Sequence, residues 1–172
     1  MQVKTVIIFF SRAGENYING KKQMITTGNT AILAGKIQQK LNLPVYELTP
    51  RIPYSVQYDE VVQKTEEERQ QFAQVDYEEL LLELEEQVET IFLGFPNWWG
   101  TYPRVIAAFL AANNWENKTI YPFCTHEGSA FGSSIEDLEK SCPGAEIKLG
   151  LAVRGSRVEQ SDTAVKNWLK TY

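Results

Sequence analysis

The chain has 172 residues and a formal net charge of −5, with 43% hydrophobic and 23% charged residues. This composition is close to the globular average and excludes a disordered chain, a coiled coil and a fibrous repeat. The longest apolar run, residues 105–112, is too short to span a membrane, and residues 3–10 lack a secretory cleavage pattern. Two cysteines are too few for a disulfide framework, so we expect one soluble, cytoplasmic domain over residues 1–172.

Negative charge is concentrated in one segment. Residues 59–89 contain twelve acidic and two basic side chains. The segment is either a solvated acidic helical region or a surface that steers a basic partner towards the protein. The sequence has no basic stripe interleaved with aromatic residues, which argues against nucleic-acid binding.

Hydrophobic patterning predicts strands and helices that alternate along the chain. Short runs rich in β-branched and aromatic residues indicate strands, and apolar residues at three- and four-residue spacing indicate amphipathic helices. In chain order we expect a strand at 3–10, a helix at 29–41, a strand at 43–48, helices at 59–72 and 76–87, a strand at 88–95, a helix at 103–112, a strand at 118–124, a helix at 133–141, a continuous strand at 145–153 and a helix at 160–171.

This alternation predicts an α/β fold, namely a doubly wound five-stranded parallel sheet with helices on both faces. Ligands of such sheets bind beyond the carboxyl ends of the strands. The loops that follow the first, third and fourth expected strands therefore form the candidate site.

The first of these loops starts at Ser11 and ends with Thr27, Gly28, Asn29 and Thr30, where a helix begins. A helix N-terminus presents unpaired backbone N–H groups that bind phosphate, and glycine permits close approach of the backbone. The loop lacks both the Walker Gly-Lys-Ser/Thr and the Gly-x-Gly-x-x-Gly dinucleotide pattern. A mononucleotide phosphate therefore fits better than ATP or NAD, although an ordinary helix cap would use the same residue types.

Residues 13–26 separate the two ends of this loop, where a tight turn would suffice. Asn19-Gly20 is a strong two-residue hairpin signal. We therefore expect an inserted β-hairpin near the phosphate site. The hairpin is either an insertion with no role at the site, or a partial lid or a contact for a partner.

The second and third loops carry aromatic and polar side chains. Trp98 and Trp99 directly follow a buried strand, and packing alone would struggle to satisfy both indole N–H groups, so we expect a wall for a flat heteroaromatic ligand. The third loop, residues 125–132, would supply polar donors to the same ligand. It contains the only histidine of the chain, His126, whose role is either structural or functional.

Together the three loops resemble the flavodoxin family over almost the whole chain. Ser11 and the run 27–30 resemble the family's Ser/Thr-x-Thr-Gly-x-Thr phosphate loop, here split by residues 13–26. The run 96–100 resembles the Pro-x-Trp-Trp-Gly flavin loop of a subgroup with an inserted phosphate loop, and residues 125–132 resemble the third flavin-contacting loop. The resemblance implies FMN as cofactor and strand order 2-1-3-4-5. Cys124 and Cys142 show no metal-ligand spacing, so we expect no metal site.

The resemblance also implies which side chains and backbone segments contact FMN. They come from all three loops: Ser11, Thr27, Gly28, Asn29, Thr30, Pro96, Asn97, Trp98, Trp99, Gly100, Thr125, His126, Glu127, Gly128, Ser129 and Gly132. Arg12 is unusual beside a flavodoxin phosphate site and is expected to point to solvent.

A fold of this family implies a redox protein in which FMN carries the chemistry. We expect electron transfer, with a small NAD(P)H-dependent quinone or nitro-reductase as the alternative and a flavin-dependent sensor as a third reading. Whether the chain is an enzyme stays open at this point, and no catalytic residue is assigned. The expected partner is a redox protein or a small-molecule electron acceptor, and the chain is expected to be a monomer or a homodimer.

Overall fold

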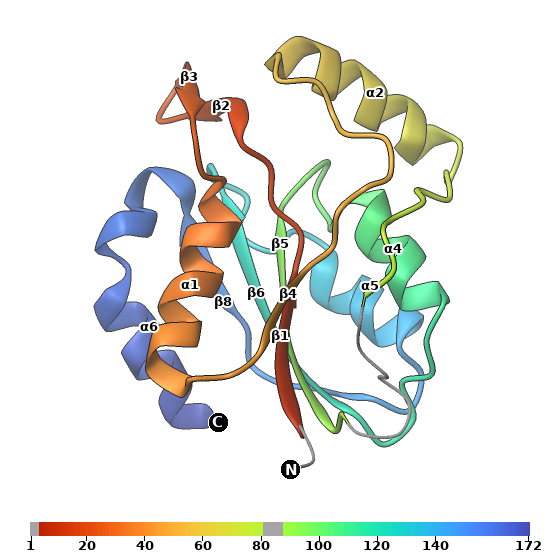
Figure 1. Cartoon of the computed structure of the whole chain (residues 1–172), viewed down its shortest axis with the longest axis vertical. Coiled ribbons are helices and arrows are strands. Elements are labelled where there is room, and N and C mark those ends of the chain that lie inside the picture. The colour runs from red at the N-terminus through yellow and green to blue at the C-terminus, as the bar shows by residue number, and fades with distance from the viewer. Residues whose placement is uncertain (1–3, 81–87) are drawn as a thin grey trace.

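The computed structural model describes residues 4–80 and 88–172. Its centre is a parallel sheet with helices on both faces (Figure 1). The strands run in the order β4-β1-β5-β6-β7, with β8 also paired to β6. Their bounds are β1 (Thr5–Phe9), β4 (Val45–Glu47), β5 (Thr90–Pro96), β6 (Thr119–His126), β7 (Glu146–Ile147) and β8 (Leu151–Arg154).

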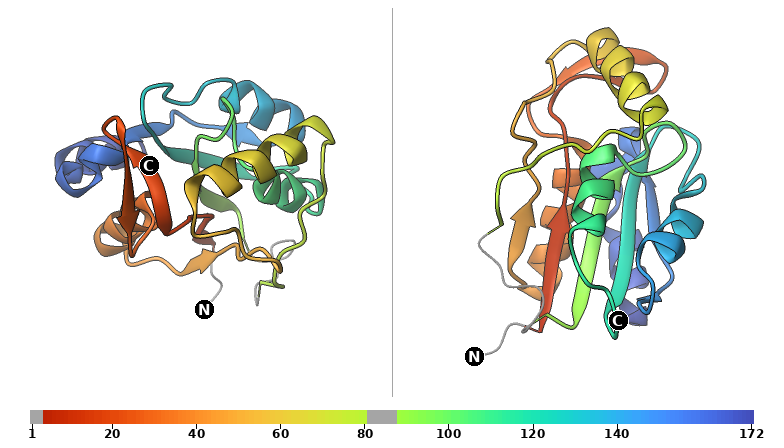
Figure 2. Two further views of the ribbon diagram at one scale, coloured as in Figure 1. Left: turned by 90° about the horizontal axis from the view of Figure 1, so that it is seen from above. Right: turned by 90° about the vertical axis from the view of Figure 1, so that its right-hand side faces the viewer.

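Each face of the sheet has its own apolar core, because successive residues of a strand point to opposite faces. Val6 and Ile8 of β1 belong to the core under α4 (Arg104–Ala111) and α5 (Ser134–Ser141). Ile7 and Phe9 of the same strand belong to the core under α1 (Asn29–Leu41) and α6 (Asp162–Trp168). Seen from above in Figure 2, these two pairs of helices lie on opposite sides of the sheet.

The expected hairpin is confirmed. Strands β2 (Gly14–Ile18) and β3 (Lys21–Ile25) pair in antiparallel fashion, and the turn residues Asn19 and Gly20 have φ values of 51° and 80°. Positive φ at both positions is the signature of a type I′ turn, for which Asn-Gly is the preferred sequence. The hairpin stands beyond the carboxyl edge of the sheet, above the start of α1 (Figure 1).

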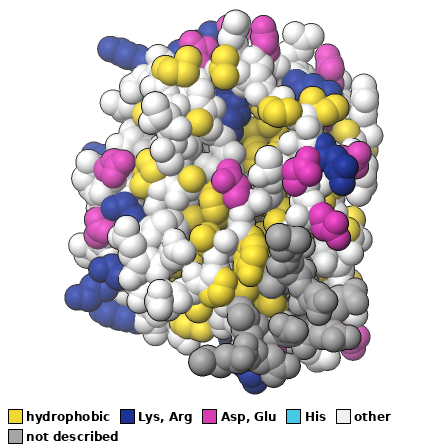
Figure 3. Space-filling view, viewed as in Figure 1, with side chains coloured by type: hydrophobic (Ala, Val, Ile, Leu, Met, Phe, Trp, Pro, Cys, Tyr) yellow, Lys and Arg dark blue, Asp and Glu magenta, His cyan; other side chains and the backbone are white. Residues whose placement is uncertain are grey.

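Helix α2 (Tyr58–Gln70) also lies beyond this edge and carries part of the acidic segment. It exposes Asp59, Glu60 and Glu67 together with the basic Lys64 and Arg69. Figure 3 shows acidic and basic side chains intermixed over this face of the molecule. The arrangement agrees with a solvated helix of mixed charge.

The expectation of a continuous fifth strand is wrong, and the sheet has six strands rather than five. Strand β7 ends at Ile147, and pairing with β6 resumes only where Phe123 lies opposite Leu151 of β8. Pro122 of β6 lies at this interruption and has no N–H with which to continue the ladder. The order 2-1-3-4-5 describes the sheet only when β7 and β8 are counted as one strand and the hairpin is left out.

The helix expected at 76–87 is wrong for the described part of that segment. Residues 76–80 are not helical, and Tyr77 instead forms an antiparallel bridge with Pro50. Backbone pairing here outweighs the helical propensity of the glutamate- and leucine-rich sequence. Residues 81–87 lie outside the described residues.

The other helices, except the last, begin and end within two residues of the expected positions. The closing helix expected at 160–171 is interrupted: α6 lies between the 3₁₀ segments η1 (Gly155–Gln160) and η2 (Leu169–Thr171). No helix in the described part of the chain is long and apolar enough to cross a membrane.

Two glycine substitutions test how tightly the sheet packs. A Cβ at Gly94 of β5 would lie 2.2 Å from the ring of Phe123, whereas a Cβ at Gly35 of α1 would meet nothing within 4 Å. We expect Gly94→Ala to lower the free energy of unfolding by about 2 kcal/mol, because the core must shift. Gly35→Ala should raise it by roughly 0.5–1 kcal/mol through helix propensity. Urea unfolding monitored by circular dichroism measures both, and equal stabilities of the two variants would contradict the packing described.

Candidate functional site

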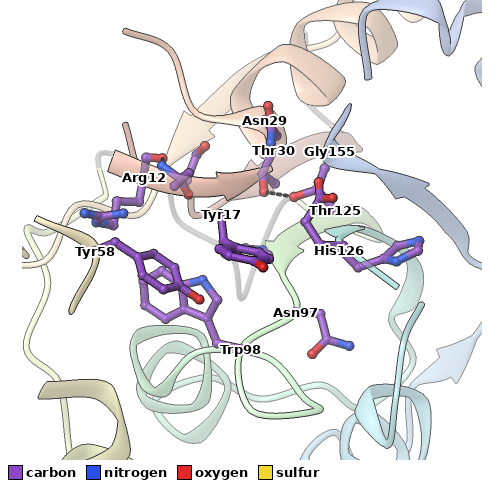
Figure 4. A pocket seen from close by; sticks show the side chains of 14 residues that line it. Arg12, Tyr17, Asn29, Thr30, Tyr58, Asn97, Trp98, Thr125, His126 and Gly155 are labelled. Carbon is purple, nitrogen blue, oxygen red and sulfur yellow. Dashed lines mark hydrogen bonds between the residues drawn. The ribbon is translucent and has the colours of Figure 1, made fainter. Parts of the chain in front are cut away.

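The loops after β1, β5 and β6 meet at the carboxyl edge of the sheet and line a cleft of about 170 Å³ (Figure 4). The hairpin, α2 and the residue after β8 complete the lining. The lining residues are Ser11, Arg12, Asn16, Tyr17, Asn29, Thr30, Tyr58, Pro96, Asn97, Trp98, Thr125, His126, Glu127 and Gly155.

One end of the cleft is the start of α1, whose N-cap, Gly28, provides no side-chain hydrogen bond. The backbone N–H groups of Asn29 and Thr30 donate to no described residue, and that of Ala31 donates to Ser11 Oγ at 3.0 Å. A Cβ at position 28 would lie 2.1 Å from Ser11 Oγ, so only glycine allows this close packing. The start of α1 therefore offers two available N–H donors and the positive end of the helix dipole, next to the Ser11 hydroxyl. This combination is suited to binding an anion.

Arg12 adds positive charge to this cleft and corrects the expectation that it points to solvent. Its half-buried guanidinium donates to Ser55 O at 2.8 and 3.2 Å and to Glu15 O at 2.7 Å. Burial lowers the pKa of Arg12, and the neighbouring charge of Glu15 opposes that shift. Because its hydrogen-bond acceptors are carbonyl oxygens rather than carboxylates, its charge is not neutralised by an ion pair within the described structure.

The other end of the cleft is aromatic. Trp98 packs edge-on against Phe10 and Tyr54, with ring centroids 5.3 Å apart in both pairs. Tyr17 of the hairpin and Tyr58 of α2 line the same cleft as Trp98 (Figure 4). The rings of Tyr17 and Tyr58 lie 5.9 Å apart at an interplanar angle of 32°.

The second tryptophan lies against α2. Trp99 Nε1 donates to Thr65 Oγ1 at 3.0 Å, and the Arg69 guanidinium lies 5.3 Å from its ring. Between α2 and the tryptophans is a second hollow, of about 240 Å³, that shares Arg12, Asn16, Tyr58, Asn97 and Trp98 with the cleft. Val61, Val62, Thr65 and Trp99 complete its lining. Thus the cleft continues into a largely apolar slot.

Hydrogen bonds made by side chains, to another side chain or to the backbone, fix the three loops relative to one another. The Thr30 and Thr125 hydroxyls form a buried hydrogen bond of 2.7 Å that joins α1 to β6. The Asn97 amide donates to Ala130 O at 2.7 Å, and its Oδ1 accepts the Gly100 N–H at 3.0 Å. Because these bonds use side chains of the loops themselves, the cleft is formed in advance of any ligand.

His126 holds the third loop while it lines the cleft. Its Nδ1 accepts the Gly128 N–H at 2.9 Å, which requires Nδ1 to be unprotonated. Burial lowers the pKa of His126, the charge of Arg154 lowers it further, and Glu127 opposes the shift. The neutral ring, with its proton on Nε2, is therefore the form that this geometry stabilises.

Comparison with known proteins identifies the family. The flavodoxin family model matches residues 22–172, which is most of the chain. The chain belongs to the flavodoxin family. No curated protein matches it.

Solved structures share the fold over the length of the chain. A protein of Bacteroides eggerthii that has been assigned as a flavoprotein is 24% identical, with a TM-score of 0.76 over 98% of this chain and 96% of that one. A flavoprotein of Lactobacillus acidophilus in complex with FMN is 16% identical, with a TM-score of 0.63 over 98% and 99%. Flavodoxin 2 of Bacillus cereus is 16% identical, with a TM-score of 0.55 over 98% and 99%.

The structure brings most of the expected flavodoxin site residues together. Those that line the cleft are Ser11, Asn29, Thr30, Pro96, Asn97, Trp98, Thr125, His126 and Glu127, and Trp99 lines the adjoining hollow. The remainder are not among the lining residues: Thr27, Gly28, Gly100, Gly128, Ser129 and Gly132. Gly28 and Gly132 are nevertheless required for close packing of the loops, because a Cβ at Gly132 would lie 2.1 Å from Gly100 O.

Sequence reasoning missed five lining residues, one of which is Arg12, the residue expected to point to solvent. Asn16 and Tyr17 belong to the hairpin, which was expected near the phosphate but with no residue assigned to the cleft. Tyr58 reaches the cleft from α2, and the sequence around it contains no motif that signals this. Gly155 follows β8, and its position after a strand at the same sheet edge is a signal that could have found it.

The pKa of His126 can be followed directly, because the chain has a single histidine. We expect its Cε1 proton resonance to titrate below the ordinary value of 6.5, and Arg154→Gln to raise the pKa by removing a neighbouring positive charge. The contribution of this group to stability is present above the unfolded pKa and is lost as the pH falls through the lower folded pKa. Arg51→Gln, on the loop after β4, is the control, and an equal change in both variants would refute the role of Arg154.

Proposed function

We propose that the cleft binds FMN, with the phosphate at the start of α1 and the isoalloxazine ring against Trp98. The observation that carries this proposal is that one cleft has available N–H donors at one end and aromatic side chains at the other. FMN has the matching layout, because a ribityl chain separates its phosphate from its flat ring. The family and the FMN complex of the Lactobacillus acidophilus flavoprotein support the same cofactor.

Three features support the position of the phosphate. The N–H groups of Asn29 and Thr30 are available as donors, and the Ser11 hydroxyl accepts the Ala31 N–H and so keeps its own proton to donate. The positive end of the α1 dipole lies at the same place. A phosphate dianion would therefore meet two backbone donors, a hydroxyl donor and a helix dipole.

The aromatic end supports the position of the ring. Trp98 is fixed edge-on by Phe10 and Tyr54, and the hollow beside it is lined by Tyr58 and Trp99. Flat heteroaromatic ligands pack well on such surfaces, and apolar walls exclude water from the ring. The expected site residues that do not line the cleft would shape the loops: Thr27, Gly28, Gly100, Gly128, Ser129 and Gly132.

We further propose that the protein transfers electrons to a redox protein or a small-molecule acceptor. Bound FMN would supply the uptake and release of one or two electrons. The chain would bind it, orient it and limit what reaches it, because Tyr17 and Tyr58 occupy the opening between the hairpin and α2. A nicotinamide must lie flat on a flavin to deliver hydride, so these two rings favour electron transfer over an NAD(P)H-dependent reductase.

Removal of the Ser11 hydroxyl tests the phosphate position. We expect Ser11→Ala to weaken FMN binding about tenfold or more, because a hydrogen bond to a charged group is lost. Riboflavin has no phosphate, so its affinity should stay unchanged. Quenching of flavin fluorescence measures both constants, and Ser141→Ala, which deletes the same group at the far end of α5, is the control. Equal weakening of riboflavin and FMN would contradict the assignment.

Redox titration of the FMN-loaded protein tests the function. We expect two resolved one-electron potentials, rapid reduction of ferricyanide and negligible oxidation of NADH in the presence of menadione. A single two-electron potential with fast, menadione-dependent NADH oxidation would instead support the quinone reductase. Failure to bind FMN would overturn both functions.

A further inference from the structure

A hollow of about 630 Å³, here called the loop hollow, lies apart from the proposed flavin cleft. It shares no lining residue with that cleft or with the hollow beside Trp99. Its walls are the loop after β4, one face of α2 and the segment that follows α2 (Figure 1). A volume of this size is typical of pockets that bind small molecules.

Hydrogen bonds to the backbone hold the walls of the loop hollow in place. The Arg51 N–H donates to Asp76 O at 3.0 Å, which joins the loop after β4 to the segment after α2. The Ala73 N–H donates to Glu68 O at 2.8 Å, and the Arg104 side chain donates to Ala73 O at 2.9 Å. Because these bonds lie within the protein, the loop hollow is formed in advance of any ligand.

Much of the wall is apolar. Ile52 lines the loop hollow and exposes 84% of its surface to solvent. A ligand that covered this side chain would remove apolar surface from water, which favours binding. The apolar lining residues are Ile52, Pro53, Tyr54, Ala73 and Val75.

Glu68 places one buried carboxylate in this lining, because the residue is only 6% exposed. The Tyr54 hydroxyl donates to its Oε2 at 2.8 Å. Its Oε1 accepts no hydrogen bond from a described residue, and no described lysine or arginine forms an ion pair with it. Among the described residues the one fully enclosed side-chain N or O atom without a partner is Ser134 Oγ, so Glu68 Oε1 still adjoins open space. That space is the loop hollow, which Glu68 lines.

The charge inside the loop hollow is therefore set by Glu68. The other charged lining residues are exposed, two of them basic and two acidic, and water screens exposed charges strongly. Burial raises the pKa of the Glu68 carboxyl, and the hydrogen bond from Tyr54 and the charges of Lys64 and Arg104 oppose this shift. A buried carboxylate with one free oxygen gains most from a cation that donates a hydrogen bond to it. The exposed charged lining residues are Arg51, Glu60, Lys64 and Asp76.

We propose that the loop hollow binds a small apolar molecule that carries a protonated amine. The ammonium group donates to Glu68 Oε1 and supplies the missing positive charge, and the carbon skeleton covers Ile52 and Val75. A ligand with a carboxylate or phosphate in place of the amine is repelled by Glu68. The site is distinct from the flavin cleft and does not require FMN, although Tyr54 packs edge-on against Trp98 and so connects the two.

Phenethylamine, phenethyl alcohol and phenylacetate test this proposal, because they share a phenyl ring and differ in the charge of the polar end. Each is titrated at millimolar concentration into the full chain, with and without FMN, and the backbone amide resonances are followed by NMR. We expect saturable shifts with phenethylamine, in residues 51–55 and 73–76, weaker ones with the alcohol and none with phenylacetate. Absence of shifts in these two segments with phenethylamine, or equal shifts with phenylacetate, would overturn the proposal.

The variant Glu68→Gln tests the role of the carboxylate. It keeps an oxygen that can accept the Tyr54 hydrogen bond but removes the charge, so we expect phenethylamine to bind about tenfold more weakly. Glu67→Gln is the matched control, because it removes an equal charge from the next residue of α2, which is exposed and does not line the loop hollow. Equal weakening in both variants would contradict a direct contact with Glu68.

Two surface variants test the same site without altering the buried carboxylate. Ile52→Ser should weaken phenethylamine and phenethyl alcohol to the same extent, about threefold or more, because it removes apolar contact only. Lys64→Gln should strengthen phenethylamine binding, since it removes a cation that competes for Glu68. Unchanged binding in Ile52→Ser, or weaker binding in Lys64→Gln, would refute the proposed position of the ligand. Failure of the chain to bind FMN would overturn the proposed function and leave this site untouched.

Discussion

The close contact between Gly28 and Ser11 is the constraint on which the site depends. It brings the end of β1 against the start of α1, so the serine hydroxyl, rather than a side chain of the N-cap residue, accepts the Ala31 N–H. The donors ahead of Ala31 are then left without partners in the described structure, which makes the helix terminus available to an anion. A larger residue at position 28 would separate the two segments and remove this arrangement.

The sheet supplies the rigid support for these loops. Each of the strands that precede them is buried between two helical layers, and its carboxyl end is placed by the parallel register with its neighbours. Side-chain bonds from Thr30 and Asn97 then join loops that are far apart in sequence. The hairpin forms a separate two-stranded sheet, so it covers part of the cleft without pairing with the strands beneath it.

The sequence was sufficient for the parts of the fold in which local pattern and tertiary structure agree. The apolar run of β1, the amphipathic pattern of α1 and the Asn19-Gly20 turn each follow from residues close together in the chain. The predictions from sequence were wrong where contacts between residues far apart in the chain determine the local structure. Tyr77 pairs with Pro50, and the break between β7 and β8 lies opposite Pro122 of β6. Likewise, Tyr58 joins the site only because α2 is placed over the cleft, which no local motif signals.

The interruption of the last strand also affects how the sheet ends. The described sheet has β4 at one edge and β7 and β8 at the other, and these strands span only three, two and four residues, so each presents a short row of backbone groups to its surroundings. Long flat edges recruit further strands from other molecules and lead to aggregation, whereas short edges offer little to pair with. The proline that breaks the ladder within the fold therefore also helps to keep separate copies of the protein from joining edge to edge.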